Sequence, residues 1–239
     1  MKNFFEAPIV RAAGVLALGP IVAALIAGYA LFQIRTASDI ITVTGSARET
    51  VTSDHAKWTL SVSARTGLYD QNTGYAALAR GVADIKKKLV DAGLTEAETN
   101  PSSVFEQYGQ NSVVTGYQMS QDVVVQSDDV KKIQALANDT QKMQGEGYLV
   151  HTGAVEYTYT KLDDMRVKLL GNAIKDAEAR ANTITSVSKR STGALKNASS
   201  GVVQVLAKNG VDISDYGSYD TQSIDKDVMV TVRAVFGIK

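Results

Sequence analysis

The stretch HAKWTLSVSAR, residues 55–65, decides how the middle of this chain folds. Its apolar residues Ala56, Trp58, Leu60, Val62 and Ala64 alternate strictly with Lys57, Thr59, Ser61 and Ser63. Successive side chains of a β-strand point to opposite faces, so this alternation predicts a half-buried strand. Just before it, Ile41 and Val43 alternate with Thr42 and Thr44, which predicts another strand.

Helical spacing replaces the alternation in three segments. Apolar residues step by three and four from Tyr75 to Leu89, and Gly93 then serves as a C-cap. A short helix is predicted through residues 130–140, with Ser127 as its N-cap. A long helix is predicted from Leu162 to Lys189, burying one apolar face. The members of that face are Leu170, Ile174, Ala177, Ala181 and Ile184.

The remaining alternating segments predict strands at residues 102–109, 116–126, 155–159, 201–208 and 228–236. The order strand, helix, strand, strand occurs twice, in pattern-level modules at about 40–127 and 147–239. No repeat of individual residues accompanies it. We therefore predict an α+β fold with two β-α-β-β modules, whose helices pack on one face of mixed or antiparallel sheets.

Residues 12–34 carry no charged side chain and lie between Arg11 and Arg35. At the helical rise they span about 34 Å, enough for a bilayer core of about 30 Å. This favours a signal anchor, with residues 1–11 cytoplasmic and residues 35–239 outside the cytoplasm. A cleaved signal remains an alternative, because Gly28-Tyr29-Ala30 offers a small-x-small site. A buried soluble helix is disfavoured, because no face is polar.

Small residues recur at every fourth position of this predicted transmembrane helix. Gly19, Ala23 and Ala27 form one row, and Ala24 and Gly28 form the next. Small residues at this spacing let transmembrane helices approach closely, so we interpret these five residues as a packing face for a second copy.

Catalytic residue types are scarce. There is no cysteine, and the two histidines, His55 and His151, stand in no metal-binding spacing. Ser186 and Lys189 fit S-x-x-K, but the accompanying motifs of penicillin-binding enzymes are absent. The 25 basic and 25 acidic residues form no basic cluster suited to nucleic acid. We therefore predict no enzymatic activity and assign no catalytic, cofactor-binding or metal-binding residue.

The loop NGVDISDYGSYDTQSID, residues 209–225, combines aspartates with two tyrosines. Its aspartates do not follow the EF-hand calcium pattern. A solvated connector and a protein-contact loop remain open as interpretations, and Tyr216 and Tyr219 favour the second.

Four stretches carry a family resemblance: ITVTGSARETVTSDHAKWTLSV at residues 41–62, GYQMSQDVVVQSDDV at residues 116–130, NAIKDAEARANTI at residues 172–184, and Thr192-Gly193-Ala194-Leu195. In these stretches the chain resembles the bacterial SIMPL-domain proteins. Where the family often has G-x-G and Pro-Asp, this chain has Gly45-Ser46-Ala47 and Ser53-Asp54. The resemblance implies an envelope or periplasmic protein without established catalytic residues, some of whose relatives form large homo-oligomers.

Together these observations predict a single-pass protein of the bacterial inner membrane, with most of the chain in the periplasm. Its expected partners are the membrane and further copies of itself, assembled as a ring or cage. An alternative is a ligand-binding or chaperone-like module acting as a monomer or dimer, which requires an apolar pocket with convergent polar groups. A hydrolase using Ser186 or Ser188 with Lys189 is a third, less favoured alternative.

Overall fold

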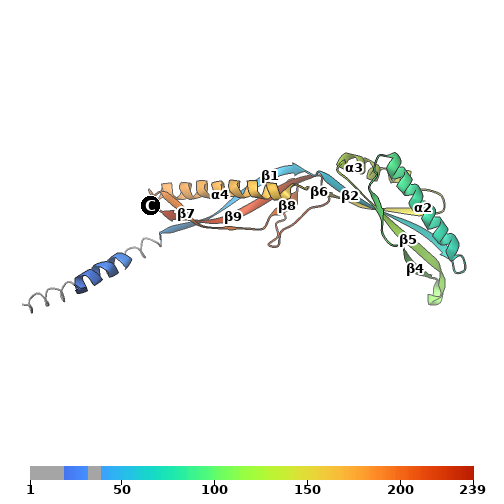
Figure 1. Cartoon of the computed structure of the whole chain (residues 1–239), viewed down its shortest axis with the longest axis horizontal. Coiled ribbons are helices and arrows are strands. Elements are labelled where there is room, and N and C mark those ends of the chain that lie inside the picture. Colours follow the sequence, from blue (N-terminus) through green and yellow to red (C-terminus); the bar gives the residue numbers. More distant parts are fainter. Residues whose placement is uncertain (1–18, 32–38) are drawn as a thin grey trace, which may run out of the picture. The chain divides into compact units, whose positions relative to one another are not determined.

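The computed structural model describes residues 19–31 and 39–239 (Figure 1). Residues 19–31 are helical, and the remainder of the predicted anchor lies outside the described residues. No helix within the described ranges is both long and apolar enough to cross a bilayer. The predicted packing face, Gly19, Ala23, Ala24, Ala27 and Gly28, is exposed in this segment. A Cβ added at Gly19 or Gly28 would meet no atom within 4 Å.

The described chain from residue 39 onward divides into two compact units that interleave in sequence. In its described part, unit 1 contains residues 39–47, 170–201 and 231–239, and unit 2 contains residues 48–169 and 202–230. Three elements contribute residues to both units: strand β1 (Ile40–Thr52), helix α4 (Leu162–Val187) and strand β9 (Asp225–Ile238). These units divide the chain by contacts, whereas the two predicted modules, at about 40–127 and 147–239, divide it by sequence pattern.

Unit 2 is built on an antiparallel sheet in the order β3-β5-β2-β6, with β4 also paired to β5. Figure 1 shows helix α2 lying along β2 and β5. The bounds of these elements are β2 (His55–Gly67), α2 (Gln71–Asp91), β3 (Ala97–Thr99), β4 (Ser103–Tyr108), β5 (Val114–Ser127), α3 (Val130–Asn138) and β6 (Leu149–Thr158). Two 3₁₀ turns, η1 (Gln110–Ser112) and η2 (Thr140–Met143), complete the unit's first segment.

The core of unit 2 consists of large side chains. The alternating residues predicted to face inward from residues 56–64 are all buried, and Trp58, Leu60 and Val62 are fully enclosed. Ile85 and Leu89 from α2 and Ile133 from α3 join them in one cluster. Both helices therefore bury their apolar sides against the same sheet, as the sequence predicts.

The second sheet has the order β1-β9-β7, with β8 (Gln204–Ala207) also paired to β9 and β7 spanning Thr192–Ser200. In unit 1 it packs against α4 through Val43, Val232, Ala234 and Phe236. The facing side of α4 contributes the fully buried Ala173, Ala177 and Ala181. A Cβ on Gly45 would lie only 2.1 Å from the carbonyl oxygen of Ala173. Small residues on both elements thus let strand and helix approach closely.

Four details differ from the sequence predictions. Asp129 caps α3, accepting a hydrogen bond from the Lys132 N–H, while Ser127 accepts one from Asp129. Ile184 is 51% exposed, because the buried row of α4 steps by four through the alanines and ends at Thr185. Strands β3 and β7 were not predicted: β3 is very short, and β7 is mostly exposed, so neither has an apolar alternation.

The predicted end of α2 is nearly right. Ala92 occupies the C-cap position, and Gly93 follows it with φ of 79°. This left-handed conformation is one that glycine adopts without steric cost, and it commonly ends a helix.

Candidate functional site

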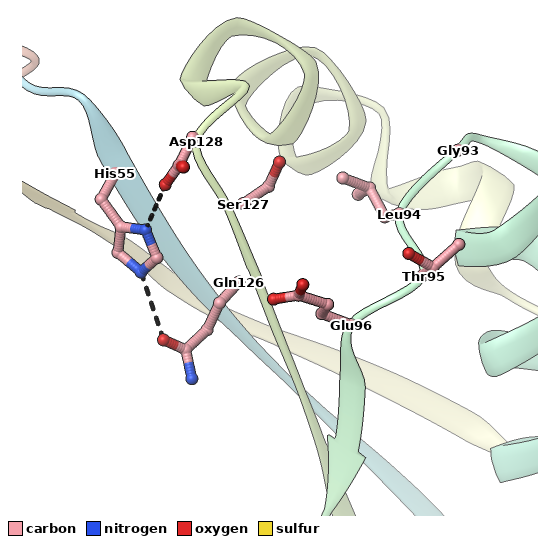
Figure 2. Close-up of a pocket in the computed structure, with 8 residues that line it drawn as sticks. All are labelled: His55, Gly93, Leu94, Thr95, Glu96, Gln126, Ser127 and Asp128. Carbon is pink, nitrogen blue, oxygen red and sulfur yellow. Dashed lines mark hydrogen bonds and ion pairs between the residues drawn. The ribbon is translucent and has the colours of Figure 1, made fainter.

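His55 is held between two side chains at the start of β2 (Figure 2). Its Nδ1 lies 2.8 Å from Oδ1 of Asp128, and its Nε2 lies 3.2 Å from Oε1 of Gln126. Antiparallel pairing of Ala56 with Ser127 brings these residues together across β2 and β5. The pairing therefore unites side chains that are separated by more than 70 positions in the sequence.

A pocket of about 160 Å³ adjoins this histidine. Glu96 enters it from the segment between α2 and β3, opposite His55 (Figure 2). The full lining is His55, Gly93, Leu94, Thr95, Glu96, Gln126, Ser127 and Asp128. The pocket is therefore mainly polar, with acidic side chains around one imidazole.

The hydrogen bond to Asp128 raises the pKa of His55 above its ordinary value of 6.5, and Gln126 and the charge of Asp54 act in the same direction. Burial opposes this rise in pKa. Both ring nitrogens face oxygen acceptors, and the protonated imidazolium, which donates from both nitrogens, is the form that this arrangement favours. The contact is accordingly a polar clamp between β2 and the start of α3.

The predicted contact loop holds its two tyrosines in different settings. Tyr216 is 97% exposed. Tyr219 is 41% exposed, and its Oη accepts a hydrogen bond of 3.0 Å from the Tyr159 N–H. The backbone beside it joins β8: Val205 donates to the Ser218 carbonyl, and Asp220 donates to the Val205 carbonyl, each at 2.8 Å. The loop thus covers the outer edge of β8.

Two buried polar side chains fasten this loop from below. The Gln204 amide donates to the Ser214 carbonyl at 2.5 Å and accepts from the Ser218 hydroxyl at 3.0 Å. Lys226 is fully buried and donates to the carbonyls of Asp220 and Ser223, each at 2.5 Å. Burial lowers the pKa of Lys226, and Asp220 opposes that shift. Both side chains are thus committed to fixing the loop.

Two pockets flank Tyr219, and both are also lined by Val205 and Ser218. The first, of about 290 Å³, is bounded further by Leu206, Ala207, Gly210, Asp212 and Asp220. The second, of about 280 Å³, is bounded further by Leu162, Arg166, Val203, Tyr216 and Gly217. These are concave, largely apolar sites with a few polar groups, the general form of a small-ligand pocket.

Two aspartates of the loop, Asp220 and Asp225, have partners within the protein. Hydrogen bonds from Ser223 and Gln222 and the charge of Lys226 lower the pKa of Asp220, although burial opposes them. Asp225 pairs with Lys208 at 3.2 Å. Within residues 19–31 and 39–239, no cluster of three or more histidine, aspartate or glutamate side chains is arranged to hold a metal ion.

In the S-x-x-K match, Lys189 contacts Ser186 through the backbone: its N–H donates to the Ser186 carbonyl at 3.0 Å. Ser186 donates to the Thr183 carbonyl at 2.8 Å, and Ser188 donates to the Ile184 carbonyl at 3.4 Å. Both hydroxyls therefore bond to the preceding helical turn, and the geometry offers no activated serine here.

The Asp176 carboxylate contacts two groups. The Arg180 Nε lies 2.9 Å from Asp176 Oδ2. The same Oδ2 also accepts a hydrogen bond of 2.8 Å from the Ser46 N–H of β1. The carboxylate thus binds a backbone donor on an edge strand of the second sheet.

The arrangement defines an α+β protein with two antiparallel sheets, one face of each packed against helices, and with pockets that carry no evident catalytic set. The SIMPL family model, described as a protein of unknown function (DUF541), matches residues 41–236. The chain belongs to this family, as its sequence resemblance indicates.

Comparisons with other proteins add little to this assignment. No curated protein matches the chain. The crystal structure of a hydantoinase/carbamoylase family amidase from Burkholderia ambifaria is 14% identical in sequence, with a TM-score of 0.26. The match covers 46% of this chain and 29% of the amidase chain. The chain therefore spans less than a third of that structure. The crystal structure of a hydrolase from Listeria innocua is 8% identical, with a TM-score of 0.18. The match covers 80% of this chain and 91% of the hydrolase chain.

Proposed function

We propose that this chain is a non-enzymatic, membrane-anchored envelope protein whose extracytoplasmic part assembles into a large homo-oligomer with a scaffolding role. Residues 12–34 would anchor it in the bacterial inner membrane, with most of the chain in the periplasm. The uncharged length of residues 12–34 and membership of the SIMPL family support this proposal.

The observation that carries self-association is the hairpin formed by β4 and β5. Val104, Phe105, Tyr108 and Val113 are exposed on it, with Phe105 at 60% and Tyr108 at 62%. Among the described residues, strand β4 has a ladder partner, β5, on one side only. Apolar side chains on an open strand edge favour pairing with another chain, and a second copy supplies the same surface.

The test is the particle mass of the full-length protein in mild detergent, repeated after removal of residues 1–35. A large particle that survives the truncation assigns assembly to the outer part, and one that is lost assigns it to the anchor. A monomer in both samples contradicts the proposal.

A charged variant locates the interface on the full chain. Phe105→Lys places a charge on the hairpin, so we expect the large particle to be lost. Tyr69→Lys is the control, because Tyr69 is 96% exposed and lies outside the hairpin. Equal masses for the two variants would remove the hairpin from the interface.

A second candidate function is periplasmic ligand binding by a monomer or dimer. The pockets beside Tyr219 favour it, because they combine apolar walls with polar groups on a fixed loop. Saturable binding of a small ligand, independent of particle mass, distinguishes this function from scaffolding.

A further inference from the structure

The pocket between α4 and the loop of residues 209–225 has a mostly apolar lining with one charged residue. Leu162, Val203 and Val205 supply apolar surface, and Tyr216 and Tyr219 add aromatic rings. Arg166 is the charged residue in its lining. A ligand that fits this distribution is apolar over most of its surface and carries one negative group.

Arg166 remains available to such a ligand. Its guanidinium is 3.9 Å from Asp163, whose side chain is 97% exposed. Water screens a contact of this length between exposed groups, so it contributes little. A guanidinium presents paired donors that match the two oxygens of a carboxylate.

Tyr219 offers a second donor at the same pocket. Its oxygen accepts the Tyr159 N–H, while its own O–H proton has no acceptor among the described residues. A phenolic hydroxyl both donates and accepts, so this proton is free to bind an oxygen of the ligand.

The wall that carries Tyr219 is fixed before any ligand binds. Gln204 and Lys226 are buried beneath it and donate to backbone carbonyls of the loop. Burying an amide and an ammonium group is costly unless their hydrogen bonds are satisfied, and here the loop satisfies them. A loop fixed in this way lowers the entropic cost of binding.

We propose that this pocket binds a small monocarboxylate with a compact apolar body, such as a single ring or a short acyl chain. The carboxylate would bind Arg166 and the Tyr219 hydroxyl, and the apolar body would lie on Val203, Val205 and Leu162. The inference rests on the ligand-binding candidate function, and it is independent of self-assembly.

The test compares two ligands of equal shape, 3-phenylpropionate and the uncharged 3-phenylpropanamide. Binding to the full-length protein in mild detergent is measured by calorimetry and by saturation-transfer NMR. We expect the acid to bind with a Kd of about 1 mM or tighter, and the amide to bind about tenfold more weakly.

Arg166→Gln supplies the matched protein variant. It should weaken binding of the acid about tenfold and binding of the amide much less, since only the acid pairs a negative charge with the guanidinium. Arg166 is an exposed residue, so the fold should persist, which far-UV circular dichroism checks. Arg80→Gln is the control, because the Arg80 guanidinium donates to its own helix at Ala76.

Three results would overturn the inference: no saturable binding of the acid, equal affinity for acid and amide, or unchanged affinity in Arg166→Gln. Particle mass is measured on the same samples. If the protein assembles but does not bind the acid, the ligand-binding inference is wrong and the scaffolding proposal stands. If the protein is a monomer that binds the acid, the scaffolding proposal is wrong and the ligand-binding inference stands.

Discussion

The interiors of the two units are packed differently, one with large side chains and the other by close approach of backbones. Unit 2 fills its interior with bulky side chains such as Trp58, Leu60 and Leu89. Unit 1 brings the backbones of β1 and α4 together over Gly45 and the alanines of α4. A bulky interior is sensitive to losing volume, and a close backbone contact is sensitive to gaining it. Loss of volume should therefore cost most in unit 2, and gain of volume should cost most at the strand–helix contact of unit 1.

The largest effect is expected from Trp58→Ala in unit 2. Trp58 is fully buried, so its truncation leaves a cavity that costs about 3–5 kcal/mol of unfolding free energy. Urea unfolding followed by far-UV circular dichroism measures the loss. Tyr69→Ala, at an exposed aromatic residue, should change stability by less than about 0.5 kcal/mol. A loss below about 1 kcal/mol in Trp58→Ala would break the comparison.

Gly45→Ala tests unit 1 in the opposite direction. The added methyl group would lie 2.1 Å from the Ala173 carbonyl oxygen and 2.8 Å from the Ala177 Cβ. Separating strand from helix to accommodate it should cost about 1–3 kcal/mol in the same unfolding experiment.

Gly171→Ala is the matched control for that variant. Gly171 lies in α4 with no atom within 4 Å of the added Cβ. The substitution should stabilise the protein by about 0.5–1 kcal/mol, because alanine favours a helix more than glycine does. Destabilisation by both glycine variants would show that close approach is not the cause.

A smaller effect is expected from Asp176→Asn, which tests the polar contact between α4 and β1. The amide oxygen can still accept the Ser46 N–H, but the charge that strengthens this bond and the pair with Arg180 is lost. We expect a loss of about 1 kcal/mol in unfolding free energy. Glu178→Gln, an exposed acid on the same helix, should be neutral. If Asp176→Asn and Glu178→Gln changed the unfolding free energy equally, the contact between Asp176 and β1 would contribute nothing to stability.

The smallest effect is expected at His55, the polar clamp of unit 2. Its raised pKa means that the folded state binds the proton more tightly than the unfolded state does. The stabilisation is therefore complete below pH 6.5 and is lost as pH rises through the folded-state pKa. Because Asp128 is 88% exposed, we expect less than about 1 kcal/mol.

Unfolding of His55→Gln, measured from pH 5 to pH 9, checks this pH dependence. Compared with the unmodified protein, the variant should be less stable at the acidic end, and the difference should shrink as pH rises. His151→Gln is the control, since His151 is exposed and lies outside the Asp128 cluster. If the stability difference between the variant and the unmodified protein grew as pH rises, the pKa of His55 would not be raised in the folded state.

Alternation and helical spacing were sufficient to predict most of the fold. Residues 56–64 face inward as predicted, because a half-buried strand leaves a clear period of two. Strand β7 leaves no such trace, since exposed residues occupy most of both its faces. Ile184 was assigned to the buried face because its neighbours fit a mixed spacing, whereas the alanine row selects a strict step of four.

Less of the candidate site than of the fold could be predicted from the sequence. No feature of the sequence around His55 or Asp128 links the two residues, which lie 73 positions apart. Only the register of β2 with β5 brings them together, and register depends on pairing that one sequence does not display. Arg166 likewise had no local signal, because its pocket is completed by a loop some 50 residues away. Tyr219 was predicted as a contact residue, and whether it contacts a partner stays a prediction.

The interleaving of the two units constrains the order in which the protein matures. Domains generally fold as units while the chain is being synthesised. Every residue of unit 2 precedes position 231, whereas unit 1 needs Val232, Ala234 and Phe236 to close its core over Gly45. The earliest segment of unit 1 must therefore wait, unpaired, until unit 2 has been made in full. During synthesis, the unit 1 part of β1 therefore waits longest for its partner strand, β9.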